Sequence, residues 1–174
     1  MKVLIFRVMS AIMLLCCMTV IFNFSAQDAE QSTETSSKVI EKVAKAVYPD
    51  FEELDDNQKQ EKIDGLQFTV RKFAHFSIYT ALGIFAFLTM VSYRGLKLKV
   101  RVFISLAFCL FYAVSDELHQ LLSAGRSCEL RDVLIDFAGA FIGVGVSFLI
   151  VRFIKPIYKL ICFRGDKFEK KATA

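Results

Sequence analysis

The sequence predicts an all-α, multi-pass membrane protein with four transmembrane helices and a small extracytoplasmic helical cap between the first and the second. Of its 174 residues, 55% are hydrophobic, yet 23% are charged. The charged and the apolar residues are segregated into blocks, which is not typical of a soluble domain. Each long apolar block also reaches the roughly 20 residues that a helix needs to cross about 30 Å of hydrocarbon. These two observations carry the assignment.

The first apolar run, Leu4 to Phe24, is long enough to cross the membrane. A cleaved signal peptide would have a shorter apolar region of about 7–15 residues. Phe24 also stands where cleavage before Gln27 would need a small residue. We therefore expect residues 1–26 to form an uncleaved membrane anchor.

Residues 27–70 differ sharply in composition and are expected to form the cap. The stretch from Gln27 to Ser37 is polar, as in a solvated linker. Lys38 to Val47 places apolar side chains on one helical face. Asp50 is expected to cap a second, acidic helix that ends near Gly65.

Three further spans follow, at about 73–93, 102–122 and 132–154, within a membrane core of residues 71–154. The loop between the second and third spans carries four basic residues and no acid, which indicates a cytoplasmic loop. The N-terminus and the tail, residues 155–174, are also basic. Four spans with both termini in the cytoplasm satisfy all three observations.

The cysteines and the net charge exclude two other classes of protein. Four of the five cysteines lie in or beside apolar runs, and Cys128 stands alone in a predicted turn, so no disulfide framework is expected. The net charge of +4 comes from cations beside the spans, where membrane topology explains it. We therefore expect no nucleic acid as a partner, and nothing in the sequence requires a cofactor.

The most informative feature is a cluster of ionisable residues at the predicted outer ends of the last three spans. Ionisable groups within a membrane are costly, so such a cluster is by default a functional site. The candidate ligand-binding residues are Lys72, His75, Tyr79, Glu117, Gln120, Arg126, Asp132 and Asp136, and the candidate acid–base pair is His119 with Asp116.

Helix geometry predicts that these residues form one site. At about 1.5 Å of rise per residue, Tyr79, Asp116 and Asp136 each lie about 22–24 Å above the arginine at the inner end of their span. His75 and His119 lie one layer higher, at about 27–28 Å. Three spans therefore bring their polar side chains to a common level beneath the outer membrane surface.

The fourth span carries its polar and its small residues on one side. Asp132, Asp136, Gly139 and Gly143 share this stripe, with the carboxylates above the glycines. A Gly-x-x-x-Gly spacing lets a neighbouring helix approach closely. We expect Gly139 and Gly143 to pack the spans together beneath the polar layer.

Plainer interpretations of the same residues remain open at this stage. The acids can be solvated by lipid headgroups, Lys72, Arg126 and Arg131 can be interfacial anchors, and the whole cluster can be a structural ion-pair network. The same three cations also suit recognition of an anionic headgroup. We expect no metal site, because the sequence contains neither an HExxH motif nor paired cysteines. A weaker alternative is a zinc site made of His75, His119, Asp116 and Asp132.

Short motifs connect these residues to a known family. They are Arg71-Lys-Phe-Ala-His75-Phe-x-x-Tyr79-x-x-Leu-Gly83, Ser115-Asp-Glu-x-His-Gln120, Gly125-Arg126-Ser127 and Asp132-x-x-x-Asp136-x-x-Gly139, with Phe24-Ser25-Ala26-Gln27 after the first span. Together they resemble the VanZ-like family of bacterial membrane proteins. The segment Cys128-Glu-Leu-Arg131 departs from the family, whose members more often carry small or polar residues there.

The resemblance implies a protein of the bacterial plasma membrane. The family is named for a protein that gives resistance to teicoplanin, a glycopeptide that acts on lipid-linked cell-wall precursors. Our leading hypothesis is an outward-facing polar pocket that binds an anionic or lipid-linked ligand, with membrane lipids, a lipid-linked cell-wall precursor or a glycopeptide as partners. A membrane enzyme that modifies a lipid headgroup by acid–base chemistry and a scaffold for a partner envelope protein are the alternatives.

Overall fold

The computed structural model describes residues 1–27, 29–93, 95–122 and 129–153, with the backbone alone for residues 29–36 and 38. The described chain is helical and contains no strand. Its elements, in order, are α1 (Lys2–Ser25), α2 (Ala29–Val47), the short 3-10 helix η1 (Phe51–Glu53), α3 (Asp56–Val91), α4 (Leu98–Gln120) and α5 (Leu130–Phe153).

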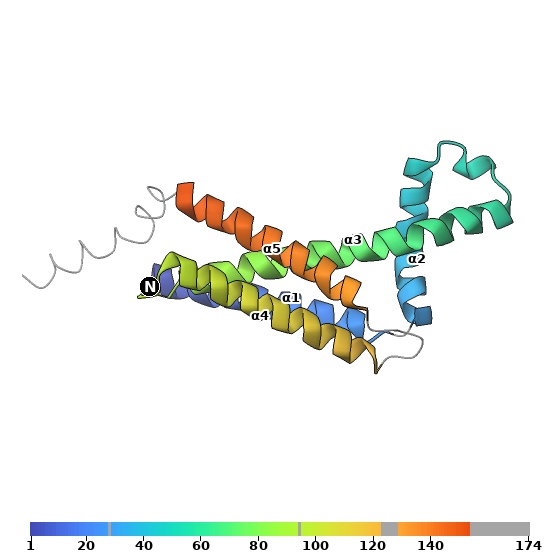
Figure 1. Ribbon diagram of the computed structural model, residues 1–174. Coiled ribbons are helices and arrows are strands. Elements are labelled where there is room, and N and C mark those ends of the chain that lie inside the picture. Colours follow the sequence, from blue (N-terminus) through green and yellow to red (C-terminus); the bar gives the residue numbers. More distant parts are fainter. Residues whose placement is uncertain (28, 94, 123–128, 154–174) are drawn as a thin grey trace, which may run out of the picture.

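Four of these helices, α1, α3, α4 and α5, are long and apolar enough to cross a membrane. They run alongside one another as a bundle, and α2 crosses the bundle direction near one end (Figure 1). The ends of α1, α4 and α5 agree with the predicted spans to within four residues. The predicted fold class, an all-α multi-pass membrane protein, is confirmed.

The most extensive helix pair is α3 with α5, and glycines make it close. A Cβ at Gly139 would lie 2.4 Å from the carbonyl oxygen of Phe76, and one at Gly143 would lie 2.1 Å from that of Thr80. Gly83 of α3 meets the α5 backbone in the same way, at 2.3 Å. Real side chains do not approach a backbone so closely, so these positions require glycine. The predicted packing role of Gly139 and Gly143 fits this geometry.

The cap differs from the prediction in its helix boundaries. The expected linker is helical, because α2 already begins at Ala29. Asp50 precedes η1 without forming a side-chain cap. Instead Asp55 caps α3, with Gln58 completing a reciprocal capping box.

The predicted helix end at Gly65 is wrong. α3 is one helix of 36 residues that continues through Gly65 into the membrane-spanning part. A single glycine in a helix costs only about 1 kcal/mol relative to alanine. Because helix-forming segments flank it on both sides, that cost is too small to end the helix.

At the bundle end opposite α2, two arginines bind the C-terminus of α3. Arg7 of α1 donates to the carbonyl oxygen of Ser92 at 2.9 Å, and its guanidinium lies 4.3 Å from the centre of the Tyr93 ring. Arg101 of α4 donates to the carbonyl oxygen of Tyr93 at 2.8 Å. Cations at a helix C-terminus satisfy its free carbonyls and complement its dipole. These contacts fix α1 and α4 against α3.

Candidate polar site near the α2 end of the bundle

Several polar side chains are buried where α1 and α4 end and α5 begins. Each is at most 6% exposed, although each lies on a helix with the length and composition of a membrane span. Together with the partly exposed His75 of α3 they form what we call the polar site: Ser25, His75, Tyr79, Asp116, Glu117, Gln120 and Asp136.

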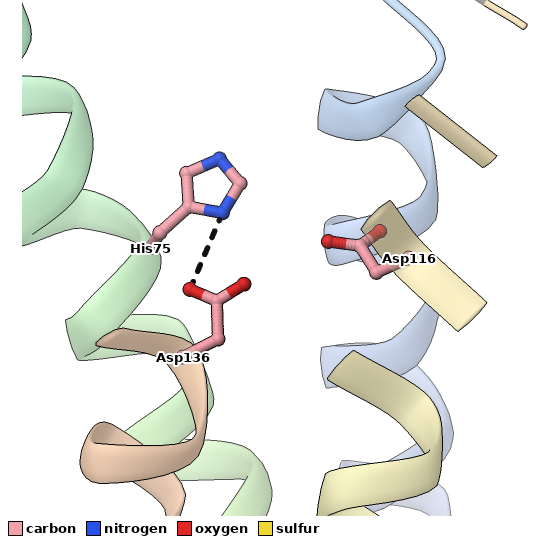
Figure 2. A group of neighbouring side chains, drawn as sticks. All are labelled: His75, Asp116 and Asp136. Carbon is pink, nitrogen blue, oxygen red and sulfur yellow. Dashed lines mark ion pairs between the residues drawn. The ribbon is translucent and has the colours of Figure 1, made fainter. Parts of the chain in front are cut away.

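The centre of the polar site is a group of three residues from three helices. One potential ligand atom each from His75, Asp116 and Asp136 lies within 4.8 Å of the other two. Figure 2 shows His75 above Asp136 on one side and Asp116 facing them across a gap. His75 Nδ1 lies 3.6 Å from Asp136 Oδ1. The common level that the helix geometry predicted for Asp116 and Asp136 is therefore present.

Asp116 is held in place by two hydrogen bonds. The Ser25 hydroxyl of α1 donates to Asp116 Oδ1 at 2.5 Å, and Gln120 Nε2 donates to Asp116 Oδ2 at 3.4 Å. Sequence reasoning did not select Ser25 as a site residue. The only signal that marked it was its place in the motif after the first span, because its partner lies 91 positions away.

Two buried polar atoms beside Asp116 have no hydrogen-bond partner among the described residues. One is the hydroxyl of Tyr79, whose side chain is completely buried and lies near the carboxylates of Asp116 and Asp136. It lies against the Asp116 carboxylate but outside hydrogen-bond geometry. The other is Oδ2 of Asp136. Such groups are rare in native proteins, where nearly all buried polar atoms are paired with protein or water.

Glu117 has a different environment from the one expected for an interfacial acid. It is 1% exposed and accepts a hydrogen bond from the backbone N–H of Glu129, which immediately precedes α5, at 3.2 Å. Solvation of Glu117 by headgroups does not fit this burial. Its carboxylate instead ties the end of α4 to the start of α5.

Cations lie at the more exposed edge of the polar site. Lys72 forms an ion pair with Asp132, and both side chains are partly exposed. The Lys72 ammonium and the Arg131 guanidinium lie 5.4 and 4.9 Å from the ring centre of Phe68, which is half exposed. We call Phe68, Lys72 and Arg131 the basic edge. Arg126, which the sequence also placed in the site, lies outside the described residues.

His119 and Asp116, the predicted acid–base pair, contact different residues in the structure. The His119 ring stacks on Phe22 of α1 at 4.5 Å between ring centres, and its buried Nδ1 has no hydrogen-bond partner in the part of the chain that the structure describes. Asp116 instead bonds to Ser25 and lies near His75. Of the weaker zinc set, the structure groups His75 and Asp116, and the third member is Asp136 rather than His119 or Asp132.

Comparison with known proteins identifies the family. The chain matches the VanZ/LLP1 family over residues 10–152. It belongs to this family. A search of curated proteins and a search of solved structures each found no match.

The VanZ/LLP1 match spans the whole polar site and most of the membrane core. The motif residues that sequence reasoning quoted serve two purposes in the structure. His75, Tyr79, Asp116 and Asp136 meet in the polar site, whereas Gly139 lies in the close contact between α3 and α5. The resemblance seen in the sequence is thus confirmed at the level of the family.

Proposed function

We propose that this VanZ/LLP1 protein binds the anionic headgroup of a lipid-linked ligand at the polar site, on the outer face of the bacterial plasma membrane, with both termini in the cytoplasm. The observation that carries the proposal is the layering of charge near the α2 end of the bundle. Partly exposed cations lie at the edge, and buried carboxylates lie deeper between the helices.

The basic edge suits the phosphate of a membrane ligand. Cations next to a membrane surface attract anionic headgroups, with about 1 kcal/mol for each basic residue. Lys72 and Arg131 flank the exposed ring of Phe68, which offers an apolar surface to the start of a lipid chain. Among the described residues, Arg131 forms its ion pair with an exposed acid, Glu129, at 2.9 Å. An exposed pair of this kind contributes little energy, so a phosphate can replace it.

The deeper layer suits hydrogen-bond donors rather than a second anion. The carboxylates of Asp116 and Asp136 and the Tyr79 hydroxyl are buried near one another. Among the described residues, Asp136 Oδ2 has no hydrogen-bond donor. A hydroxyl or ammonium group of a sugar or amino-acid headgroup would donate to it directly, and a hydroxyl group would also reach it through an ion held between the carboxylates. A lipid-linked cell-wall precursor combines both chemistries, since its phosphate adjoins a hydroxyl-rich headgroup.

Binding of purified full-length protein in detergent to two probes tests this proposal. We expect a short-chain prenyl pyrophosphate to bind at least tenfold more tightly than the matching prenol, as measured by native mass spectrometry or ligand-induced changes in Tm. Lys72→Gln should remove most of this preference, because a hydrogen bond to a charged group contributes about 1.5–3 kcal/mol.

Lys62→Gln is the matched control, because Lys62 is a cation of the same helix that lies over Tyr48 rather than at the polar site. Equal binding of the two probes, or equal effects of both substitutions, would contradict the proposal. Reduced susceptibility to teicoplanin in cells that express the protein is the expected consequence, and it should be lost with Lys72→Gln and retained with Lys62→Gln.

A further inference from the structure

We propose that His75, Asp116 and Asp136 bind a first-row divalent metal ion of the Zn²⁺ type. This inference concerns the deepest layer of the polar site and goes beyond the proposed headgroup binding, on which it does not depend. One imidazole and two carboxylates are a ligand set that such ions accept.

The geometry of the three side chains brings them close to a metal-binding arrangement. A tetrahedral ion with bonds of about 2.0–2.2 Å separates its ligand atoms by about 3.3–3.6 Å. His75 Nδ1 and Asp136 Oδ1 are already 3.6 Å apart, and no pair in the group exceeds 4.8 Å. Asp116 faces the other two across the gap in Figure 2. A shift of its carboxylate by at most about 1.2 Å, the difference between 4.8 and 3.6 Å, would complete the set.

The surroundings of Asp116 resemble the outer shell of a metal ligand. Carboxylates that bind metals are usually held by hydrogen bonds from neighbouring groups, which orient the remaining lone pairs. Ser25 donates to Oδ1 and Gln120 to Oδ2 of Asp116. Both donors are buried, and they come from two different helices. They hold the carboxylate between the helices although no cation is hydrogen-bonded to it among the described residues.

An independent observation points to a ligand at the same place. The Tyr79 hydroxyl is completely buried near Asp116 and Asp136, and no donor or acceptor among the described residues meets hydrogen-bond geometry with it. Asp136 Oδ2 is likewise unpaired, and the Asp136 side chain is almost fully buried. An ion between the carboxylates would coordinate Asp136, and a water bound to that ion would pair with Tyr79. Burying both groups without such a partner is costly.

The balance of charge favours a cation as this ligand. Asp116, Glu117 and Asp136 are all buried in the polar site. Among the described residues, the base that forms an ion pair with one of these acids is His75, since Lys72 forms its ion pair with Asp132. Buried carboxylates require pairing or a coordinated metal. A divalent ion would offset two negative charges at the centre of the group.

Metal binding by the full-length protein in detergent tests the inference in the absence of any lipid ligand. After treatment with a chelator and equilibration with Zn²⁺, we expect one equivalent per chain by elemental analysis. Asp136→Asn and His75→Gln should each weaken Zn²⁺ binding by at least tenfold. His119→Gln should leave it unchanged, because His119 stacks on Phe22 outside the group. Elution of each variant as a single species on size exclusion would show that it is folded.

A spectrum of the unsubstituted protein supplies a second readout that does not depend on the variants. With Zn²⁺ bound, X-ray absorption should show one imidazole nitrogen and otherwise oxygen ligands. Binding below one equivalent, a spectrum without imidazole, or equal losses in His75→Gln and His119→Gln would each overturn the inference. Headgroup binding is measured separately with the prenyl probes, so failure of one proposal is distinguishable from failure of the other.

Discussion

Replacement of Gly143 by alanine should separate α3 from α5. The added Cβ would lie 2.1 Å from the carbonyl oxygen of Thr80 and 3.0 Å from the backbone nitrogen of Ile84. Ordinary van der Waals contact begins at 3.4 Å, so the two backbones must move apart by about 1.3 Å, the difference between 3.4 and 2.1 Å. No side chain can rotate away to relieve this contact, because both neighbouring atoms belong to the backbone.

The expected cost follows from that displacement. A gap of only 0.5–1 Å forfeits about a quarter to a half of the dispersion energy of a contact, and overpacking a well-packed interior typically costs about 1–3 kcal/mol. The higher helix propensity of alanine returns at most about 1 kcal/mol. We therefore expect Gly143→Ala to lower the free energy of unfolding by about 1–2 kcal/mol.

Gly145→Ala on the same helix is the matched control. A Cβ at Gly145 would meet nothing within 4 Å, so this substitution should be neutral or slightly stabilising. Reversible unfolding of the purified protein in mixed micelles, followed by circular dichroism, measures both variants. If Gly143→Ala and Gly145→Ala shift the unfolding transition equally, the close approach of α3 and α5 is not present in the protein.

Three further predictions concern other contacts. Arg7→Gln should lower the free energy of unfolding by about 1–3 kcal/mol, because it removes charged hydrogen bonds to the C-terminus of α3; an unchanged Tm in detergent would contradict this contact. Asp55→Ala should cost about 1 kcal/mol and speed hydrogen exchange in the first turn of α3 alone, because it removes the capping box; uniform exchange would argue against the cap. The Lys45 ammonium lowers the pKa of Glu52, and Glu52 raises the pKa of Lys45. Their ion pair should therefore hold α2 against η1 at neutral pH, and it should be lost as pH falls through the lowered pKa of Glu52 or rises through the raised pKa of Lys45. The protection of α2 amides against hydrogen exchange, corrected for intrinsic exchange, should show the same dependence on pH. Glu52→Gln should abolish the loss of protection at low pH.

The membrane spans were predictable because bilayer thickness sets a minimum length that few soluble helices match with so apolar a composition. The cap was less predictable. Asp50 and Asp55 are both acceptable helix caps in sequence, and the structure selects Asp55 as the cap of α3. Gly65 is a local helix breaker, but its small cost is overridden by the helical segments on either side. Local sequence patterns thus predicted that the cap is helical, but they did not predict where one helix ends and the next begins.

The level of the polar residues along their helices was predictable from the sequence. The direction in which each side chain points around its helix was not. Asp116 and Asp136 were placed at one level by counting residues, and the structure brings them together. His119 was grouped with Asp116 because the two are three residues apart. That spacing still separates them by about 60° around the helix axis, and the packing of α1 against α4 turns His119 toward Phe22. Ser25 was overlooked because a serine at the end of an apolar run shows no sign of a partner 91 residues away.

The length of α3 has a mechanical consequence. Thirty-six residues at about 1.5 Å each span about 54 Å, whereas the hydrocarbon of a bilayer is about 30 Å thick. The helix that carries Lys72 and His75 is therefore longer than the membrane is thick, and part of it extends beyond the membrane. A partner that pushed on the projecting arm would tilt both side chains directly, without a flexible joint to absorb the movement.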